Sequence, residues 1–199
     1  AKQSLAPGVN YIEMRDGTTL SANVVLPGPI EDGPYPTVVE YSGYTPADPN
    51  GTGFKDLLTP LGYAYVGVNM RGTGCSGGSF RYFEYVQSTD GYDTVEAVAA
   101  QPWAFENHVG MVGVSYPGIS QLFVAQTQPP SLAAITPFSV IDDSYNSTLY
   151  PGGILNTGFA VEWTQDRVDN RQPVTHPTHT LHPPHTHTHT HTHTHTHTH

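Results

Sequence analysis

The sequence predicts an α/β domain built on a mostly parallel sheet, and three observations predict it. Short apolar runs of strand length recur along the chain, these runs lack the period-two alternation of a half-exposed sheet, and helical stretches separate the last of them. Strands alternating with helices are typical of parallel sheets joined by right-handed crossovers. We expect this domain in residues 1–175, followed by a low-complexity tail in residues 176–199.

The opening segment, residues 10–26, predicts an antiparallel hairpin. Two extended runs in it are separated by Arg15-Asp16-Gly17, and Asp-Gly between β-rich runs is a hairpin turn signal. Later runs are apolar throughout, which is typical of strands covered on both faces. The predicted strands are residues 36–41, 63–70, 109–114 and 132–138.

Two stretches between the last strands predict helices. In residues 90–101, Asp90 is placed to cap the helix, and Val95 and Val98 fall on one face with Tyr92. Residues 118–128 form the second helix, because Pro129 and Pro130 cannot continue it.

The charge balance excludes several classes of partner. Seven Lys and Arg residues against 17 Asp and Glu residues give a net charge of −10, which argues against nucleic acid and against an anionic membrane surface. No apolar run reaches the roughly 18 residues that a membrane span requires, so we expect a soluble protein. The compartment stays open: the first residue is Ala1 rather than Met, and secretion after loss of a leader is one alternative.

Residues 113–118, Gly-Val-Ser-Tyr-Pro-Gly, lie between a predicted buried strand and a predicted helix. This is the context of a nucleophile elbow, in which a serine occupies a strained turn between small neighbours. The second glycine comes one place late, at Gly118, and Pro117 is tolerated in a first helical turn. An inert serine in a plain turn is the alternative. The pattern favours Ser115 as a nucleophile, with helix N–H groups near a developing oxyanion.

Four sequence blocks taken together resemble the CocE/NonD hydrolases, a family that includes cocaine-esterase-like and X-Pro dipeptidyl-peptidase-like (peptidase S15) serine hydrolases. The blocks are MRGTGCSGGSF (70–80), GYDTVEAVAAQPW (91–103), VGMVGVSYPGISQ (109–121) and YPGG (150–153). The resemblance spans residues 10–165 and implies an α/β-hydrolase catalytic domain. A helical cap would begin at about residue 142, and full-length members continue into a jelly-roll domain.

The resemblance also implies an activity and its residues. The reaction would be acyl transfer to water from an ester or amide, with a small-molecule or peptide substrate and no cofactor. By position, Ser115 would be the nucleophile and the backbone N–H of Tyr116 one oxyanion donor. The hydroxyl of Tyr44, just after the strand at 36–41, would be the second donor, an assignment that depends on the resemblance alone.

A glycine-rich segment, residues 72–77, also fits the Gly-x-Gly-x-x-Gly pattern of dinucleotide-binding sites. That fingerprint must open a helix, whereas residues 78–83 continue with bulky aromatic side chains. We therefore interpret the segment as a structural loop near the rim of the active site. Cys75 within it is expected to be a bystander, because no strand-to-helix turn presents it.

The sequence does not identify the acid and base of a triad. His108 precedes the strand that ends at Ser115, and at ~3.3 Å per residue the two lie on the order of 20 Å apart, which excludes it as the base. Asp142 and Asp143 are weak candidates for the acid and fit the start of a cap better. We expect a poor catalyst, with a residual acceleration of order 10³ to 10⁴ over water.

The tail holds 11 of the 12 histidines, and His and Thr alternate strictly from His185 onward. A CA dinucleotide repeat in DNA translates as such a run, so the favoured interpretation is that the run replaces the true C-terminal part of the protein. The alternative is a non-catalytic self-assembling or metal-binding protein that uses the tail imidazoles. A truncated sheet would expose an edge strand, so we also expect self-association.

Overall fold

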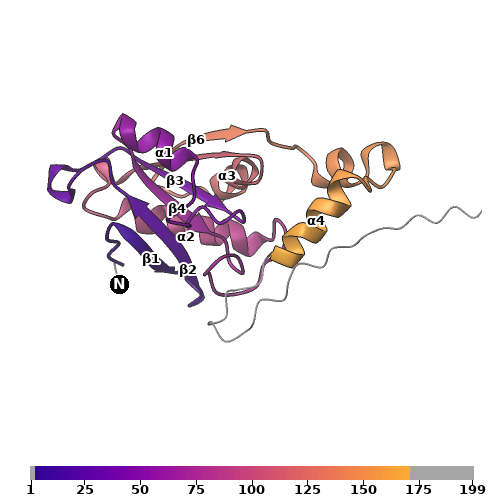
Figure 1. Ribbon diagram of the computed structural model, residues 1–199, viewed down its shortest axis with the longest axis horizontal. Coiled ribbons are helices and arrows are strands. Elements are labelled where there is room, and N and C mark those ends of the chain that lie inside the picture. The colour runs from indigo at the N-terminus through magenta and orange to yellow at the C-terminus, as the bar shows by residue number, and fades with distance from the viewer. Residues whose placement is uncertain (1–2, 171–199) are drawn as a thin grey trace, which may run out of the picture.

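A mixed six-stranded sheet organises residues 3–170, the part of the chain that the computed structural model describes (Figure 1). The strand order is β1-β2-β4-β3-β5-β6. The pairs β1/β2 and β2/β4 are antiparallel, and the pairs β3/β4, β3/β5 and β5/β6 are parallel. The strands are β1 (Gly8–Glu13), β2 (Thr19–Val25), β3 (Thr37–Ser42), β4 (Ala64–Asn69), β5 (Val109–Val114) and β6 (Leu132–Phe138). The mostly parallel sheet that the sequence predicts is confirmed.

The N-terminal hairpin forms as expected around its Asp-Gly turn. Gly17 adopts a φ of 82°, a left-handed conformation that glycine reaches without the penalty of a Cβ. The Asp16 carboxylate accepts a hydrogen bond of 2.9 Å from the backbone N–H of Thr18 and so closes the turn.

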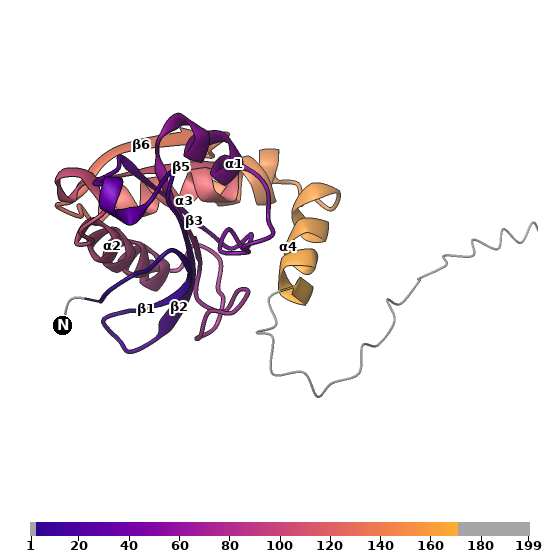
Figure 2. The ribbon, with the colours of Figure 1, turned by 60° about the vertical axis from the view of Figure 1, so that its left-hand side comes forward.

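Four helices and several short turns connect or follow the strands. The helices are α1 (Phe54–Leu58), α2 (Tyr85–Ala99), α3 (Tyr116–Gln126) and α4 (Phe159–Asn170). The short turns are η1 (Ile30–Asp32), η2 (Thr59–Leu61), η3 (Phe105–Asn107), the π-helical η4 (Ser144–Leu149) and η5 (Pro151–Gly153). None of the helices within residues 3–170 is long and apolar enough to cross a membrane. Helix α4 lies beyond the carboxyl end of β6, to one side of the sheet (Figures 1 and 2).

The structure corrects the start of one predicted helix. Helix α2 begins at Tyr85, so Asp90 is not its cap but an interior residue with 1% of its surface exposed. The expectation is wrong because a tertiary partner satisfies Asp90: its carboxylate binds the guanidinium of Arg71. The predicted apolar face of the helix is correct, since Val95 and Val98 are fully buried.

The core lies between the sheet and the helices α2 and α3. Helix α3 is anchored to β3 by Ser120, whose hydroxyl donates a 2.7 Å hydrogen bond to the backbone carbonyl of Tyr41. Helix α2 is anchored to the same strand, because the Tyr41 hydroxyl donates to the backbone carbonyl of Gln87 at 3.0 Å. Apolar side chains from strands and helices fill the space between, including Val39, Val66, Val68, Val95, Val98, Trp103, Met111 and Val124. Ser115, the candidate nucleophile, lies between β5 and the anchored helix α3.

Strand β6 differs from expectation. The sequence predicts a strand covered on both faces, but β6 forms an edge of the sheet in the described residues and pairs there with β5 alone. Every residue of β6 is half-exposed or exposed, and Phe138 at its end is 53% exposed. Self-association through this edge stays a prediction.

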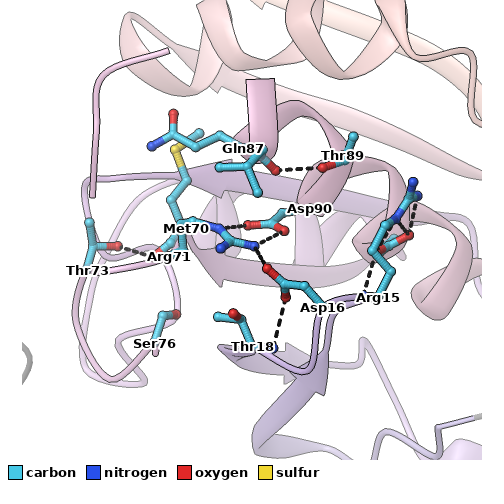
Figure 3. Close-up of polar contacts among 12 residues, drawn as sticks. Arg15, Asp16, Thr18, Met70, Arg71, Thr73, Ser76, Gln87, Thr89 and Asp90 are labelled. Carbon is cyan, nitrogen blue, oxygen red and sulfur yellow. Dashed lines mark hydrogen bonds and ion pairs between the residues drawn. The ribbon is translucent and has the colours of Figure 1, made fainter. Parts of the chain in front are cut away.

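An ion-pair network ties the hairpin turn to α2 (Figure 3). Arg71, in the loop just after β4, binds Asp90 on α2 through two hydrogen bonds of 2.6 Å. A further nitrogen–oxygen contact of 2.9 Å joins Arg71 to Asp16 in the turn. The backbone N–H of Thr18, and after it the guanidinium of Arg71, lower the pKa of Asp16 to about 2. The network therefore holds together three segments that are distant in sequence: the hairpin turn, the loop after β4 and α2.

Candidate active site

Ser115 occupies a strained turn between β5 and α3. Its φ of 65° and ψ of −122° are rarely adopted by a residue with a side chain, and such conformations cost of order 1–3 kcal/mol. The turn is held on both sides: the Ser115 N–H donates to the Phe138 carbonyl at 3.0 Å, and the Ser115 carbonyl accepts from the Ile119 N–H at 2.8 Å. The side chain is exposed. This is the geometry that a nucleophile elbow requires.

A side chain at either of the two glycines near Ser115 would collide with a different neighbour. A Cβ on Gly113 would lie 2.5 Å from the Cβ of Pro117, within the turn itself. A Cβ on Gly118 would lie 2.3 Å from the carbonyl oxygen of Phe138, where α3 crosses the end of β6. At the late position of the second glycine, a side chain would therefore collide with the end of the neighbouring strand. Pro117 lies in the first turn of α3, as the sequence indicates.

Ser115 opens into a cavity of about 320 Å³ between the elbow and α4. Aromatic and aliphatic side chains dominate its walls, and none of the described residues that line it carries a charge. The lining residues are Tyr44, Tyr82, Phe83, Ser115, Tyr116, Ile119, Ser139, Ile141, Ser144, Thr148, Leu149, Phe159, Ala160, Trp163 and Thr164. All three predicted site residues, Tyr44, Ser115 and Tyr116, thus meet at one apolar cavity.

Tyr116 lines the cavity, and almost none of its surface is exposed to solvent. It is the first residue of α3, where the N–H groups have no partner within the helix and the helix dipole favours negative charge. Its ring is stacked on Phe83, with centroids 4.9 Å apart, and its hydroxyl donates to the Gln87 side chain at 3.3 Å. Burial, as the main cause, raises the pKa of this hydroxyl. The side chain is therefore a neutral anchor for the turn.

The hydroxyl of Tyr44 lies at the same cavity and has a partner on α4. The indole N–H of Trp163 donates to the Tyr44 hydroxyl oxygen at 3.0 Å. The Tyr44 ring also packs against Tyr116, with centroids 5.6 Å apart, and the Arg167 guanidinium lies 5.1 Å above its centre. Tyr44 is thus held by residues from two helices.

The sequence reasoning missed α4 and its aromatic residues. Trp163 contacts Tyr116 and Tyr82 through ring pairs with centroids 6.0 and 5.5 Å apart, and the Tyr82 hydroxyl donates to the Thr164 carbonyl at 2.8 Å. The available signal was the spacing of Phe159, Ala160 and Trp163, which fall on one face of a helix. Without a visible cap or stop signal, that spacing is weak.

The described residues bring no triad base or acid to Ser115. His108 is the one histidine between residues 3 and 170; it lies before β5, at the strand end opposite Ser115, and contacts the Glu106 carbonyl at 2.8 Å. Asp143 caps η4 by accepting from the N–H groups of Tyr145 and Asn146. Asp142 accepts from Ser147 at 2.8 Å. Both carboxylates are therefore occupied within their own segment, and neither lines the cavity.

The glycine-rich segment forms a tight loop without a following helix. The Gly72 N–H donates to the Gly77 carbonyl at 2.8 Å, and Ser76 donates to the Asn69 carbonyl at 2.8 Å. Cys75 in this loop is exposed and unpaired. Within residues 3–170 no group of three or more His, Cys, Asp or Glu side chains is arranged to hold a metal, and the His-Thr run lies outside the described residues.

Comparison with known proteins shows that the chain is similar to known hydrolases. The family model of X-Pro dipeptidyl-peptidase (S15 family) matches residues 16–196. The chain is 31% identical over 160 residues to cocaine esterase of Rhodococcus sp. (strain MB1 Bresler), covering 77% of this chain and 27% of that protein. It thus spans about a quarter of the length of that relative.

Solved structures show the same similarity. A CocE/NonD family hydrolase of Staphylococcus aureus superposes with a TM-score of 0.73 at 27% identity, covering 83% of this chain and 37% of that one. An aminopeptidase from a marine sediment archaeon superposes with a TM-score of 0.72 at 19% identity, covering 85% of this chain and 31% of that one. At this lower identity the likeness concerns the fold alone.

Proposed function

The chain belongs to the S15 family of X-Pro dipeptidyl-peptidases and their CocE/NonD relatives, and from this premise we propose that it carries the nucleophile and oxyanion side of a serine hydrolase. The fold is that of the α/β hydrolases. The observation that carries the proposal is Ser115, exposed at a φ of 65° between β5 and α3, at the mouth of an apolar cavity. The bond attacked is an ester or an amide.

In the proposed reaction the Ser115 oxygen attacks the carbonyl carbon of the substrate. A new carbon–oxygen bond forms while the carbonyl electrons move to its oxygen, which becomes the oxyanion. The Tyr116 N–H and the Tyr44 O–H donate hydrogen bonds to this oxyanion, and the end of α3 adds its positive dipole. When the oxyanion collapses, the bond from the carbonyl carbon to the leaving oxygen or nitrogen breaks. The leaving group takes a proton from solvent and departs as the alcohol or amine, and the acyl group stays on Ser115. Residues 3–170 hold no base near Ser115, so in the step as written the Ser115 proton passes to solvent.

We infer that the acyl group is uncharged and largely apolar. The cavity beside Ser115 is walled by rings and aliphatic chains, and none of its described lining residues offers a counter-charge. Transfer of an unpaired ammonium or carboxylate into such a site costs several kcal/mol. Aromatic side chains favour the binding of flat or hydrophobic acyl groups, because the apolar surface of both is removed from water.

Covalent labelling of Ser115 tests the proposed function. p-Nitrophenyl acetate has a leaving group good enough to acylate a serine without a strong base, so acetylation should occur even in a weak catalyst. We expect mass spectrometry of the intact protein and its peptides to place one acetyl group on Ser115. Ser115→Ala should abolish the adduct, whereas Ser139→Ala, at another serine of the cavity wall, reports on reactivity elsewhere in the cavity. An acetyl group that persists in Ser115→Ala would overturn the proposal.

A further inference from the structure

We propose that Trp163 is a positioning residue that turns Tyr44 into a directed donor for the oxyanion. The inference rests on the proposed function, since it concerns the donor that Ser115 chemistry would use. It is carried by one contact, the 3.0 Å hydrogen bond from the Trp163 indole N–H to the Tyr44 hydroxyl oxygen. The two residues are 119 positions apart in sequence, so only the fold brings them together.

The chemistry of a hydroxyl explains why this contact matters. A tyrosine hydroxyl both donates and accepts, and an indole N–H only donates. In the bond with Trp163, Tyr44 must therefore accept, and its own proton remains available for a second partner. A hydrogen bond received by the oxygen also polarises the O–H bond and strengthens the bond it donates. Trp163 thus sets both the direction and the strength of Tyr44 as a donor.

The surroundings of Tyr44 support the same role. Its ring packs on the ring of Tyr116, whose backbone N–H is the other proposed donor, so the two residues that carry the donors are in contact. The Arg167 guanidinium, which pairs with Asp166, lies over the Tyr44 ring and helps to hold the ring in place. Helix α4, which carries Trp163 and Arg167, is fixed to the rim of the cavity by the hydrogen bond from Tyr82 to Thr164.

The second tryptophan shows what a purely structural indole looks like in this fold. Trp103 is 1% exposed and donates its N–H to the backbone carbonyl of Leu5 at 2.9 Å. Trp163 is only partly buried, lines the cavity and donates to a side-chain hydroxyl that lines it too. The pair of indoles therefore provides an internal comparison for an experiment.

Nuclear magnetic resonance tests the contact itself. In a ¹⁵N-labelled protein, Tyr44→Phe removes the acceptor of the Trp163 N–H while keeping the ring. We expect the indole resonance of Trp163 to move upfield and that of Trp103 to stay in place. An unchanged Trp163 resonance, in a variant whose backbone spectrum remains that of the folded protein, would overturn the proposal.

The consequence for catalysis is tested by acetylation of Ser115 with p-nitrophenyl acetate in a double-mutant cycle. Trp163→Phe deletes the N–H but keeps an aromatic ring, and we expect the limiting acetylation rate to fall about three- to tenfold, the value of one hydrogen bond, with little change in half-saturation. In the Tyr44→Phe background the same substitution should change the rate less than about twofold, because the hydroxyl on which it acts is gone.

The outcomes separate this inference from the proposed function. Equal effects of Trp163→Phe in both backgrounds would mean that the residue acts by packing alone, and would overturn the inference while Ser115 remains the nucleophile. If Trp163→Phe changed only the half-saturation concentration and left the limiting acetylation rate unchanged, the inference would also be overturned. Acetylation that does not depend on Ser115 would overturn the proposed function and, with it, the catalytic role of Trp163.

Discussion

Arg71 and Asp90 form a bidentate ion pair inside the protein, with two nitrogen–oxygen distances of 2.6 Å. The Asp90 side chain is 2% exposed and that of Arg71 is 10% exposed. The pair joins the loop just after β4 to the middle of α2, and Asp16 extends it to the hairpin turn (Figure 3). The loop after Arg71 leads to Phe80, Tyr82 and Phe83, which pack beside the elbow, so the pair also supports the rim of the cavity at Ser115.

We predict that Arg71→Ala lowers the free energy of unfolding by about 3–5 kcal/mol, because it leaves Asp90 buried without its counter-charge. The matched control is Arg15→Ala, which breaks the pair of Arg15, a 54% exposed side chain, with Asp93. Solvent-exposed pairs contribute about 0–1 kcal/mol. Urea denaturation of both variants measures the difference, and equal losses would contradict the buried-pair argument.

Acid should weaken this network at Asp16. Its pKa is lowered to about 2 in the folded protein, below the ordinary value of 3.8, so the folded state favours the carboxylate. The resulting stabilisation is present above the unfolded pKa and is lost as the pH falls from about 4 through about 2. Urea midpoints of wild type and Asp16→Asn should therefore converge over this interval. If the difference between the urea midpoints of wild type and Asp16→Asn did not change with pH, the charge of Asp16 would not be the source of its stabilising effect.

Glu40 should show the opposite pH dependence. Burial, which outweighs the 2.7 Å hydrogen bond from the Tyr65 hydroxyl, raises the pKa of Glu40. A raised pKa makes the protonated form the stabilising one, so its contribution is present below the ordinary pKa and is lost as the pH rises through the folded value.

Glu40→Gln keeps an acceptor for Tyr65 and removes the charge. We expect its melting temperature to exceed that of wild type at pH 7–8 and the gap to narrow near pH 4; a gain of about 1 kcal/mol corresponds to roughly 2–4 °C. Glu31→Gln, at an exposed side chain, is the matched control. A gap that does not change with pH would contradict a charge effect.

We predict that Gly118→Ala destabilises the protein by about 1–3 kcal/mol and slows acetylation of Ser115, because a Cβ there would press on the Phe138 carbonyl at 2.3 Å. Gly110→Ala, on the same strand–helix unit, meets its nearest atoms at 3.7 Å and should change stability by less than about 1 kcal/mol. For each variant, thermal melts measure the stability, and the mass of the adduct followed over time measures the acetylation of Ser115. If the two variants behave alike, the close approach of α3 to β6 is not the reason for the glycine.

The uncharged cavity predicts discrimination between two matched esters. p-Nitrophenyl phenylacetate and p-nitrophenyl phenylglycinate differ by one α-ammonium group when measured at about pH 6, below the pKa of an α-amino group. We expect at least about tenfold faster acylation of Ser115 by the phenylacetate, after correction for the spontaneous hydrolysis of each ester. Introducing a carboxylate by Leu149→Asp should narrow the ratio. Equal corrected rates would contradict an apolar acyl site.

Local signals in the sequence predicted the sheet and the elbow. The strands at 109–114 and 132–138 match the structure at both ends, because short apolar runs with clear breaks leave little choice of boundary. Ser115 was predicted for a similar reason, since the glycines on either side of it mark a turn that only small residues permit. Tyr44 and Tyr116 came from the family resemblance, and the structure places both at the cavity beside Ser115.

What the sequence alone determined was therefore the local chemistry: strand and helix periods, the hairpin turn and the strained serine. The tertiary structure decided the rest. It placed Asp90 inside α2 against Arg71, left β6 half-exposed at an edge, and brought Trp163 to the hydroxyl of Tyr44. The physical reason is that a residue's period and capping tendency are written in its neighbours along the chain, whereas its partner in an ion pair or hydrogen bond is selected by packing between distant segments.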